Sequence, residues 1–483
     1  MSYFDRYTQL GLQFTVASSP RLANKASTKK LNLLLWNEDV ADKYAIAFDK
    51  EHAHLYLSGH TPLEGVIPKA LAYSGHQFGH FNPTLGDGRA HLIGSFNDRL
   101  GQAYDLQLKG SGTTPFSRGG DGLCALGPAV REFVMSQAIG ALGVPTTECL
   151  SVVTTGEDVY RESPLPGAVL CRVASSHIRI GSFQYLALHE DKEALSQLLD
   201  TAIERYYPEI KEQGDARILE FLRAVCKRQV TLIVHWMRIG FVHGVMNTDN
   251  ILVGGETIDY GPCAMLEQFS FEQVFSSIDR QGRYAFGQQP NIASWNCARL
   301  AESLLMLFAA DNKQAVAQMS EVLTEFASDF NQQYQLMWAN KLGLLDWRDS
   351  DANLLSELLG TLKSEGLDYT NSFAALTNQL LDKPLCCFEV PEELSPWLSK
   401  WQARIEEYNT VEVCALMRSV NPAIIPRNAL IEQVIKDYYE QGDSELLEHW
   451  LPLLKDPYRY QEYEQQYIEF TTENTHYKTF CGT

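Results

Sequence analysis

The sequence lacks the patterns that mark several classes of protein. Its ten cysteines form no Cys-x-x-Cys pair and have no histidine partner at zinc-ligand spacing, so reduced thiols are expected rather than disulfides or zinc. No apolar run approaches membrane-spanning length, and the first residues carry no basic and apolar leader pattern. Repeats and low-complexity segments are also missing. These absences predict a cytoplasmic protein that contacts no membrane.

Positive charge is scarce as well. Lysine and arginine number 40 against 60 aspartates and glutamates, which gives a formal net charge of −20. Nucleic-acid binding requires a basic face, and no basic run supplies one, so no nucleic-acid partner is expected. Any cations that bind phosphate must form a local cluster in an acidic protein. The 483 residues are enough for one two-lobed enzyme or for two or three domains.

The segment from 243 to 262, HGVMNTDNILVGGETIDYGP, carries the clearest functional pattern. A kinase catalytic loop has a histidine, an asparagine seven residues later and then Asp-Phe-Gly, and the asparagine and second aspartate hold metal ions. Asn250 and Asp259 match those two positions. Between them, ILVGGETI is typical of a hairpin that turns at Gly254-Gly255. The alternative is an acidic loop in which these side chains only cap and turn.

The usual catalytic aspartate of a kinase is missing, because Val245 stands at its position. The carboxylate nearest to the metal-binding asparagine is Asp249. Further upstream, the alternating segment 103–109 predicts a strand that ends at Lys109, and a helix is expected from Pro128 to about Leu142. A strand lysine paired with a helical glutamate positions phosphates in kinases, so a pair between Lys109 and Glu132 is predicted. Two surface charges are the alternative.

Other segments have the composition of an anion site. In Gly86-Asp87-Gly88-Arg89 the backbone could approach an anion closely, although such turns also occur in plain hairpins. The glycine-rich loop after Lys109, which contains Asp121-Gly122, could reach a nucleotide or be a flexible linker. Arg172, inside a strand predicted at 168–174, must pair or bind an anion, because an unpaired buried charge is costly. Arg179 could bind an anion or simply be exposed.

His76 and His80 are four residues apart, which on a helix would suggest a metal pair. The glycines beside them argue against a helix, so structural histidines are favoured.

From about residue 193 the pattern becomes helical, after strands expected at 103–109, 149–155 and 168–174. The expected class is α+β, with a small mixed lobe and a large, mainly helical lobe. We divide the chain into an extension over residues 1–70, a nucleotide-phosphate lobe over 71–190 and a helical lobe with the catalytic loop over 191–483. The helices are expected at 215–240, 288–308, 313–341, 351–364, 369–380, 394–408, 428–441 and 444–453.

Long ordered motifs resemble those of the selenoprotein O family, which are protein adenylyltransferases on a protein-kinase-like fold. The matching segments include YSGHQFGHFNPTLGDGRA, LQLKGSGTTPFSRGGDG, LCRVASSHIRIG, the 243–262 segment and QP…WN at 289–296, and FNQQYQLMWANKLGL at 330–344 extends the likeness. The resemblance implies that ATP lies inverted relative to a kinase, so that AMP is transferred to a Ser, Thr or Tyr hydroxyl of a protein. The cations clustered in the small lobe agree with an inverted nucleotide, because negatively charged phosphates bind where positive charge is concentrated.

The resemblance also assigns roles. Asp249 would accept the hydroxyl proton, Asn250 and Asp259 would bind Mg²⁺ or Mn²⁺, and Glu132 would hold Lys109. ATP would be the substrate, with UMP transfer from UTP as a variant, and the partners would be proteins with hydroxyl side chains. A monomer is expected. The implied nucleotide contacts are Gly86, Gly88, Arg89, Lys109, Asp121, Gly122, Arg172, Arg179 and Asp259.

Two rival functions are an ATP-dependent protein kinase, with Asp249 as a relocated base, and a non-catalytic pseudokinase scaffold. The chain also departs from the family pattern. Some members end in selenocysteine or carry a redox-active thiol pair, whereas here Cys481 is followed by Gly-Thr and VFSSIDRQGRY lacks cysteine. Cys263 is the nearest substitute, so the resemblance does not support a regulatory disulfide. Leu123 stands where a basic residue is expected after GGDG.

Overall fold

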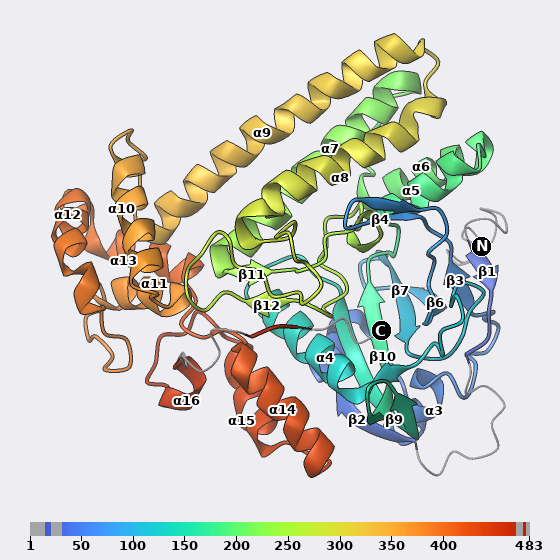
Figure 1. The fold of residues 1–483 in the computed structure, drawn as a ribbon, viewed down its shortest axis with the longest axis horizontal. Coiled ribbons are helices and arrows are strands. Elements are labelled where there is room, and N and C mark those ends of the chain that lie inside the picture. Colours follow the sequence, from blue (N-terminus) through green and yellow to red (C-terminus); the bar gives the residue numbers. More distant parts are fainter. Residues whose placement is uncertain (1–14, 21–30, 470–476, 480–483) are drawn as a thin grey trace.

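The computed structural model describes residues 15–20, 31–469 and 477–479 and has an α+β fold, as predicted. A sheet and its covering helices come from the first part of the chain, and helices dominate from residue 180 onward (Figure 1). No helix among the described residues combines the length and the apolar content needed to cross a bilayer.

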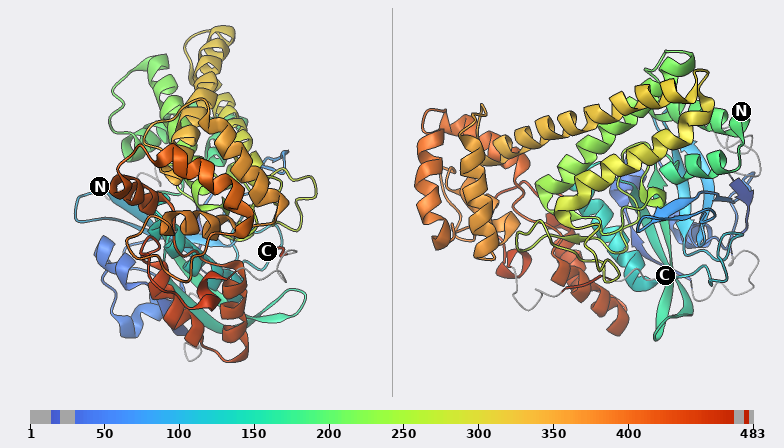
Figure 2. Two further views of the ribbon diagram at one scale, coloured as in Figure 1. Left: turned by 90° about the vertical axis from the view of Figure 1, so that its left-hand side faces the viewer. Right: turned by 45° about the horizontal axis from the view of Figure 1, so that its top comes forward.

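The main sheet contains eight of the described strands, and its printed strand pairs are antiparallel. The predicted strand at 103–109 is confirmed, and those at 149–155 and 168–174 are the inner parts of a longer hairpin. The far end of that hairpin projects from the molecule (Figure 2). In sheet order the strands are β1 (Thr15–Ala17), β3 (Lys69–Leu71), β6 (Ala90–Asn97), β7 (Ala103–Lys109), β10 (Pro164–Ala174), β9 (Glu148–Tyr160) and β2 (Asn32–Trp36), with β8 (Cys124–Ala125) on β10.

The two faces of this sheet have different roles. Leu106 and Leu108 of β7 pack in an apolar cluster with α2 (Glu38–Tyr44) and α3 (Lys50–Leu57). Because side chains alternate along a strand, Gln107 and Lys109 point to the opposite face. Arg172 of β10 is paired in register with Gln107, so its side chain joins them there. The sheet therefore presents a row of polar and cationic side chains on one face.

Helix α4 (Leu126–Ala141) covers this polar face and begins two residues before the predicted start. It carries Glu132 toward the sheet, where only 2% of the residue is exposed, so the surface-charge alternative is wrong. The other side of α4 packs against helices near the end of the chain. There Gly127 N–H donates to the Tyr439 hydroxyl at 2.9 Å, and Arg131 pairs with Glu432. Helix α4 is thus held from both sides.

The helical part agrees with the sequence-based expectation at each segment predicted between residues 215 and 453. Helices α5, α13 and α16 of this part of the chain were not expected. Helices α7, α8 and α9 lie side by side, α10 to α13 gather at one end of α9, and α14 and α15 lie beside α4 (Figure 1). Their bounds are α5 (Ile180–Leu188), α6 (Lys192–Tyr206), α7 (Gly214–Ile239), α8 (Gln289–Leu304), α9 (Asn312–Leu342), α10 (Asp351–Ser364), α11 (Tyr369–Asn378), α12 (Ser395–Ile405), α13 (Thr410–Val420), α14 (Asn428–Glu440), α15 (Glu445–Leu454) and α16 (Gln465–Ile468).

The predicted hairpin between Asn250 and Asp259 is wrong. Leu252 forms its bridge with Arg179, and Thr257 forms its bridge with Thr146, so the two halves pair with different neighbours. The glycine turn between them packs closely on α6 and α7: a Cβ at Gly254 would lie 2.4 Å from a ring carbon of Tyr206. The residues on the two sides of the turn therefore pair with other parts of the chain and not with each other. These bridges hold in place the segment that carries the predicted metal ligands.

Candidate active site

A cavity of about 300 Å³ lies between the polar face of the sheet and the 245–262 segment. The structure brings almost all of the predicted site residues to its wall, although they come from segments far apart in the sequence. Gly86 and Glu132 are the two that do not line it. Those that do are Gly88, Arg89, Lys109, Asp121, Gly122, Arg172, Arg179, Asp249, Asn250 and Asp259.

The predicted lysine–glutamate pair is present and belongs to a larger network. Lys109 Nζ lies 2.6 Å from Glu132 Oε2 and 3.1 Å from Asp259 Oδ1. Arg172 donates from Nε to Glu132 Oε1 at 3.0 Å and approaches Asp259 Oδ1 to 2.7 Å. Burial raises the pKa of Asp259, but the Arg172 and Lys109 charges outweigh it and hold the pKa well below its ordinary value. Asp259 is therefore ionised.

Both arginines that sequence reasoning left open are buried and paired. Arg172 also donates to Gln107 Oε1 at 3.0 Å, so its side chain, only 1% exposed, has polar partners around the guanidinium. Arg179 donates to the backbone oxygen of Asp249 at 3.0 Å and lies over the ring of Tyr73. The alternative that Arg179 is exposed is wrong. Arg179 therefore links the 245–262 segment to the side of the cavity that carries Lys109 and Arg172.

The Gly86–Arg89 turn reaches the cavity with its second half. A Cβ at Gly86 would lie 2.2 Å from Phe116 Cγ, so this glycine permits close packing of the turn beneath the glycine-rich loop. The carboxylate of Asp87 points inward and accepts from Leu71 N–H and from Gln107 Nε2, both at 3.1 Å. These bonds anchor the turn, and Asp87, Gly88 and Arg89 line the cavity.

The glycine-rich loop is held in place, which excludes the flexible-linker alternative. Gly112 N–H donates to the Gly122 carbonyl at 3.0 Å, and Ser117 Oγ donates to the Gly88 carbonyl at 2.5 Å. Asp121 forms an ion pair with Arg161, whose Nη1 lies 2.8 Å from Asp121 Oδ2. Arg161 also donates to the Leu123 carbonyl at 3.2 Å, so it brings positive charge to the loop where Leu123 itself has none.

Sequence reasoning missed Arg161, which lines the cavity from the end of the β9–β10 hairpin. No local signal could have found it, because nothing in the neighbouring residues marks it as part of the site. Its role follows only from the pairing of two long strands.

Asp249 lies in a short 3-10 turn, Thr248–Asn250, and is 7% exposed. Its Oδ1 atom is buried and has no hydrogen-bond partner among the described residues. Burial raises the pKa of its carboxyl to about 6, although the charges of Arg179 and Arg118 act in the opposite direction. A carboxylate with a free acceptor atom and a pKa near neutrality is suited to accept a proton.

The side-chain oxygen atoms of Asn250 and Asp259 are of the kind that binds a hard divalent cation. Asn250 Nδ2 donates to the Val245 carbonyl at 3.1 Å, and this orients the amide so that its oxygen is available to a ligand. Asp259 adds an ionised carboxylate. Amide and carboxylate oxygens are the ligands that Mg²⁺ and Mn²⁺ prefer.

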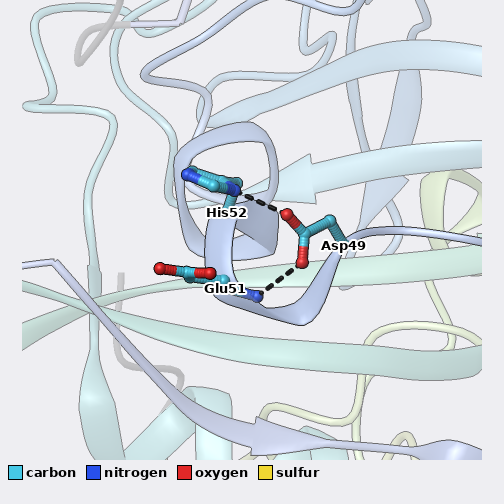
Figure 3. A group of neighbouring side chains, drawn as sticks. All are labelled: Asp49, Glu51 and His52. Atoms are coloured by element: carbon cyan, nitrogen blue, oxygen red, sulfur yellow. Dashed lines mark hydrogen bonds and ion pairs between the residues drawn. The ribbon is translucent and has the colours of Figure 1, made fainter.

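Another acidic group lies apart from this cavity. Across the described ranges, Asp49, Glu51 and His52 are the only group of three or more His, Cys, Asp or Glu residues whose potential ligand atoms lie close enough together to hold an ion (Figure 3). All three are exposed. Asp49 is the N-cap of α3, accepting from Glu51 N–H at 3.1 Å, and it also contacts His52 Nδ1 at 2.6 Å. Helix capping explains this arrangement without a metal.

The histidine and cysteine expectations have separate outcomes. His76 lies in β4 (Gly75–Gln77), and its Nδ1 is 2.9 Å from Gln184 Nε2, whereas His80 in β5 (His80–Asn82) is exposed. The two lie on opposite strands of a hairpin and not on a helix, so the helical spacing that would suggest a metal pair is absent. Cys263 is buried, and burial raises the pKa of its thiol to about 12. Cys481 falls outside the described residues.

The cavity brings clustered cations together with the side chains of Asp249, Asn250 and Asp259, an arrangement that suits a nucleotide and a metal ion. The family model for protein adenylyltransferase SelO matches residues 2–455, and the chain belongs to that family. The resemblance found in the sequence motifs is therefore confirmed.

Full-length relatives named protein nucleotidyltransferase YdiU are also similar to this chain. The relative from Pseudoalteromonas translucida (strain TAC 125) is 50% identical over 483 residues, and the one from Teredinibacter turnerae (strain ATCC 39867 / T7901) is 47% identical over 494 residues; both alignments cover 100% of each chain. The relative from Bacillus cereus (strain AH187) is 45% identical, covering 97% of this chain and 94% of its own. The chain is an enzyme of the nucleotidyltransferase class.

Proposed function

We propose that this enzyme transfers AMP from ATP to Ser, Thr or Tyr hydroxyls of protein substrates, on a kinase-like two-lobed fold and with a divalent metal ion. The main support is Asp249, a residue with an unpartnered carboxylate oxygen that lines the same cavity as Lys109, Arg172, Asn250 and Asp259. A hydroxyl that enters the cavity can meet a proton acceptor and an activated phosphate together. The relatives' printed name agrees with proteins as acceptors.

The proposal includes an inverted nucleotide. Lys109 and Arg172 are among the most buried cations of the cavity, with side chains 11% and 1% exposed. A triphosphate is drawn toward such charges, because guanidinium and ammonium groups form strong charge-assisted hydrogen bonds with phosphate oxygens. With the terminal phosphates against the sheet, the α-phosphate is the one left within reach of the catalytic loop. Because these contacts are to phosphate, UTP is a second candidate donor.

The proposed reaction is an attack by the acceptor oxygen on the α-phosphorus. Asp249 takes the hydroxyl proton, a bond forms between oxygen and phosphorus, and the bond from phosphorus to the bridging oxygen of the diphosphate breaks. Lys109 and Arg172 stabilise the negative charge of the departing diphosphate. Mg²⁺ or Mn²⁺ held by Asn250 and Asp259 would offset the phosphate charge.

Label transfer tests this function against a kinase and against a scaffold. The protein is incubated with a bystander protein, metal ion and ATP labelled at either the α- or the γ-phosphate. We expect label from α-labelled ATP only, loss of that label when a chelator removes the metal, and an added mass equal to one adenylate. Label from γ-labelled ATP alone would show a kinase, and binding of ATP without any label would show a scaffold.

Substituting Gly75 with alanine tests the position of the proposed base. An added Cβ would lie 2.3 Å from Asp249 Oδ1 and 2.6 Å from Leu85 Cδ1, so the carboxylate must move. We expect a loss of about 10²-fold in the rate of AMP transfer, because small displacements of a reacting group are costly. Gly360→Ala is the control: its Cβ would meet nothing within 4 Å, and the rate should not change. Equal rates for the two variants would contradict the proposed role of Asp249.

A further inference from the structure

Residues 117–120 of the glycine-rich loop form a tight turn in which Arg118 has a backbone conformation that arginine rarely adopts. Gly120 N–H donates to the Ser117 carbonyl at 2.8 Å, and the two residues between them have positive φ angles, 50° at Arg118 and 85° at Gly119. Turns with two positive φ angles strongly favour glycine, asparagine and aspartate at these positions. An arginine is disfavoured there by the contact of its Cβ with the backbone.

Backbone strain of this kind is rare in the protein and coincides with the candidate site. Five non-glycine residues in the described ranges have a positive φ angle, and two of the five, Arg118 and Asp259, line the same cavity. Strained residues persist where the surrounding structure holds them, and they concentrate at functional sites. The turn is held in this way, because Ser117 on one side is bonded to the Gly88 carbonyl.

The surroundings of Arg118 also differ from those of four other cations that line the cavity. Lys109, Arg172, Arg179 and Arg161 each lie within ion-pair distance of a carboxylate. The described residues provide Arg118 with no hydrogen bond or ion pair, and its side chain is exposed at the cavity wall. It therefore keeps its full capacity to bind an incoming anion and can follow that anion as it moves.

We propose that Arg118 contacts the phosphate chain of the bound nucleotide and stabilises the diphosphate as it departs. This inference rests on the proposed function. When the bond between the α-phosphorus and the bridging oxygen breaks, the electron pair stays on that oxygen and negative charge builds on the diphosphate. The paired cations in the cavity wall already share their charge with carboxylates. Arg118 forms no ion pair among the described residues and acts on Asp249 only through its charge, so it is free to contact the diphosphate, and the strained turn places it at the cavity wall.

Arg118→Gly provides a test in which folding is preserved. Glycine adopts a positive φ angle without strain, so the variant should unfold at the same temperature as the wild type or higher. We expect kcat for AMP transfer from α-labelled ATP to fall by at least about tenfold, as for other arginines that stabilise phosphoryl-transfer transition states. Added guanidinium ions should restore part of the lost rate, a rescue that a purely structural role would not allow.

Arg99→Gly is the matched control, because Arg99 is also an exposed arginine in a loop and does not line the cavity. Its kcat should equal that of the wild type and should not respond to guanidinium. If Arg118→Gly had a kcat within about twofold of the wild type, or a loss that guanidinium did not restore, the proposed role of Arg118 would be wrong. The proposed AMP transfer would not be affected by that result. Failure of the wild-type protein to transfer AMP would overturn the proposed function and this inference with it.

Discussion

Replacing Asp249 with asparagine is expected to abolish AMP transfer while ATP binding is retained. Asparagine has nearly the same shape but cannot accept a proton, and loss of a general base costs typically 10²–10⁴-fold in rate. Because Asp249 Oδ1 has no hydrogen-bond partner, the substitution breaks no contact at that atom. Initial rates with α-labelled ATP measure the first effect, and titration calorimetry with a non-hydrolysable ATP analogue measures the second.

Asp49→Asn is the control for this experiment, since Asp49 is exposed and lies outside the cavity. It should leave both transfer and binding unchanged. An Asp249→Asn variant that still transferred AMP at more than about a tenth of the wild-type rate would exclude Asp249 as the base. A variant that no longer bound the analogue would instead indicate a role in holding the nucleotide.

Replacing Glu132 with glutamine is expected to cause a large loss of stability. The glutamate is shared by Lys109 and Arg172, and both of these cations are buried. Glutamine keeps the volume but removes the charge, so two buried cations would be left with the carboxylate of Asp259 alone. Breaking a buried ion pair from one side costs about 3–5 kcal/mol of the free energy of unfolding. Urea unfolding followed by circular dichroism measures the change.

An exposed pair provides the comparison. Glu357 accepts from Lys400 at 2.6 Å, but the two side chains are 50% and 59% exposed, so Glu357→Gln should cost no more than about 1 kcal/mol. Burial raises the pKa of Glu132, but the two cations outweigh it and lower the pKa overall. The stabilisation is therefore fully present above the ordinary pKa of glutamate and is lost as the pH falls through the lowered value. A Glu132→Gln variant as stable as Glu357→Gln would show that the network contributes little.

The elements that sequence reasoning located are those with a strong local pattern. The strand at 103–109 alternates, and α7 has the regular apolar spacing of a long amphipathic helix, so both are found at nearly the expected bounds. Asn250 and Asp259 were recognisable because their spacing in the chain carries the signal. The predicted hairpin between them failed because local propensity cannot show that neighbouring segments offer better partners.

Contacts between distant segments could not be predicted from the sequence for the same reason. Arg161 joins the cavity through the pairing of β9 with β10, and Arg118 shows its importance only through its backbone angle. From the sequence alone Glu132 could have been a surface charge, yet α4 is covered on both sides and buries it. Amphipathic analysis assumes one buried face, and it fails for a helix placed between two layers.

Kinase-type enzymes are commonly switched off by swinging the helix that bears the glutamate away from the strand lysine. In this protein that rotation would have to detach Gly127 from Tyr439 and Arg131 from Glu432, and would drag the C-terminal helices with it. These contacts hold α4 in the position in which Glu132 reaches Lys109. We therefore expect the reaction rate to depend on the concentrations of nucleotide, metal ion and acceptor protein, and not on a movement of α4 between inactive and active positions.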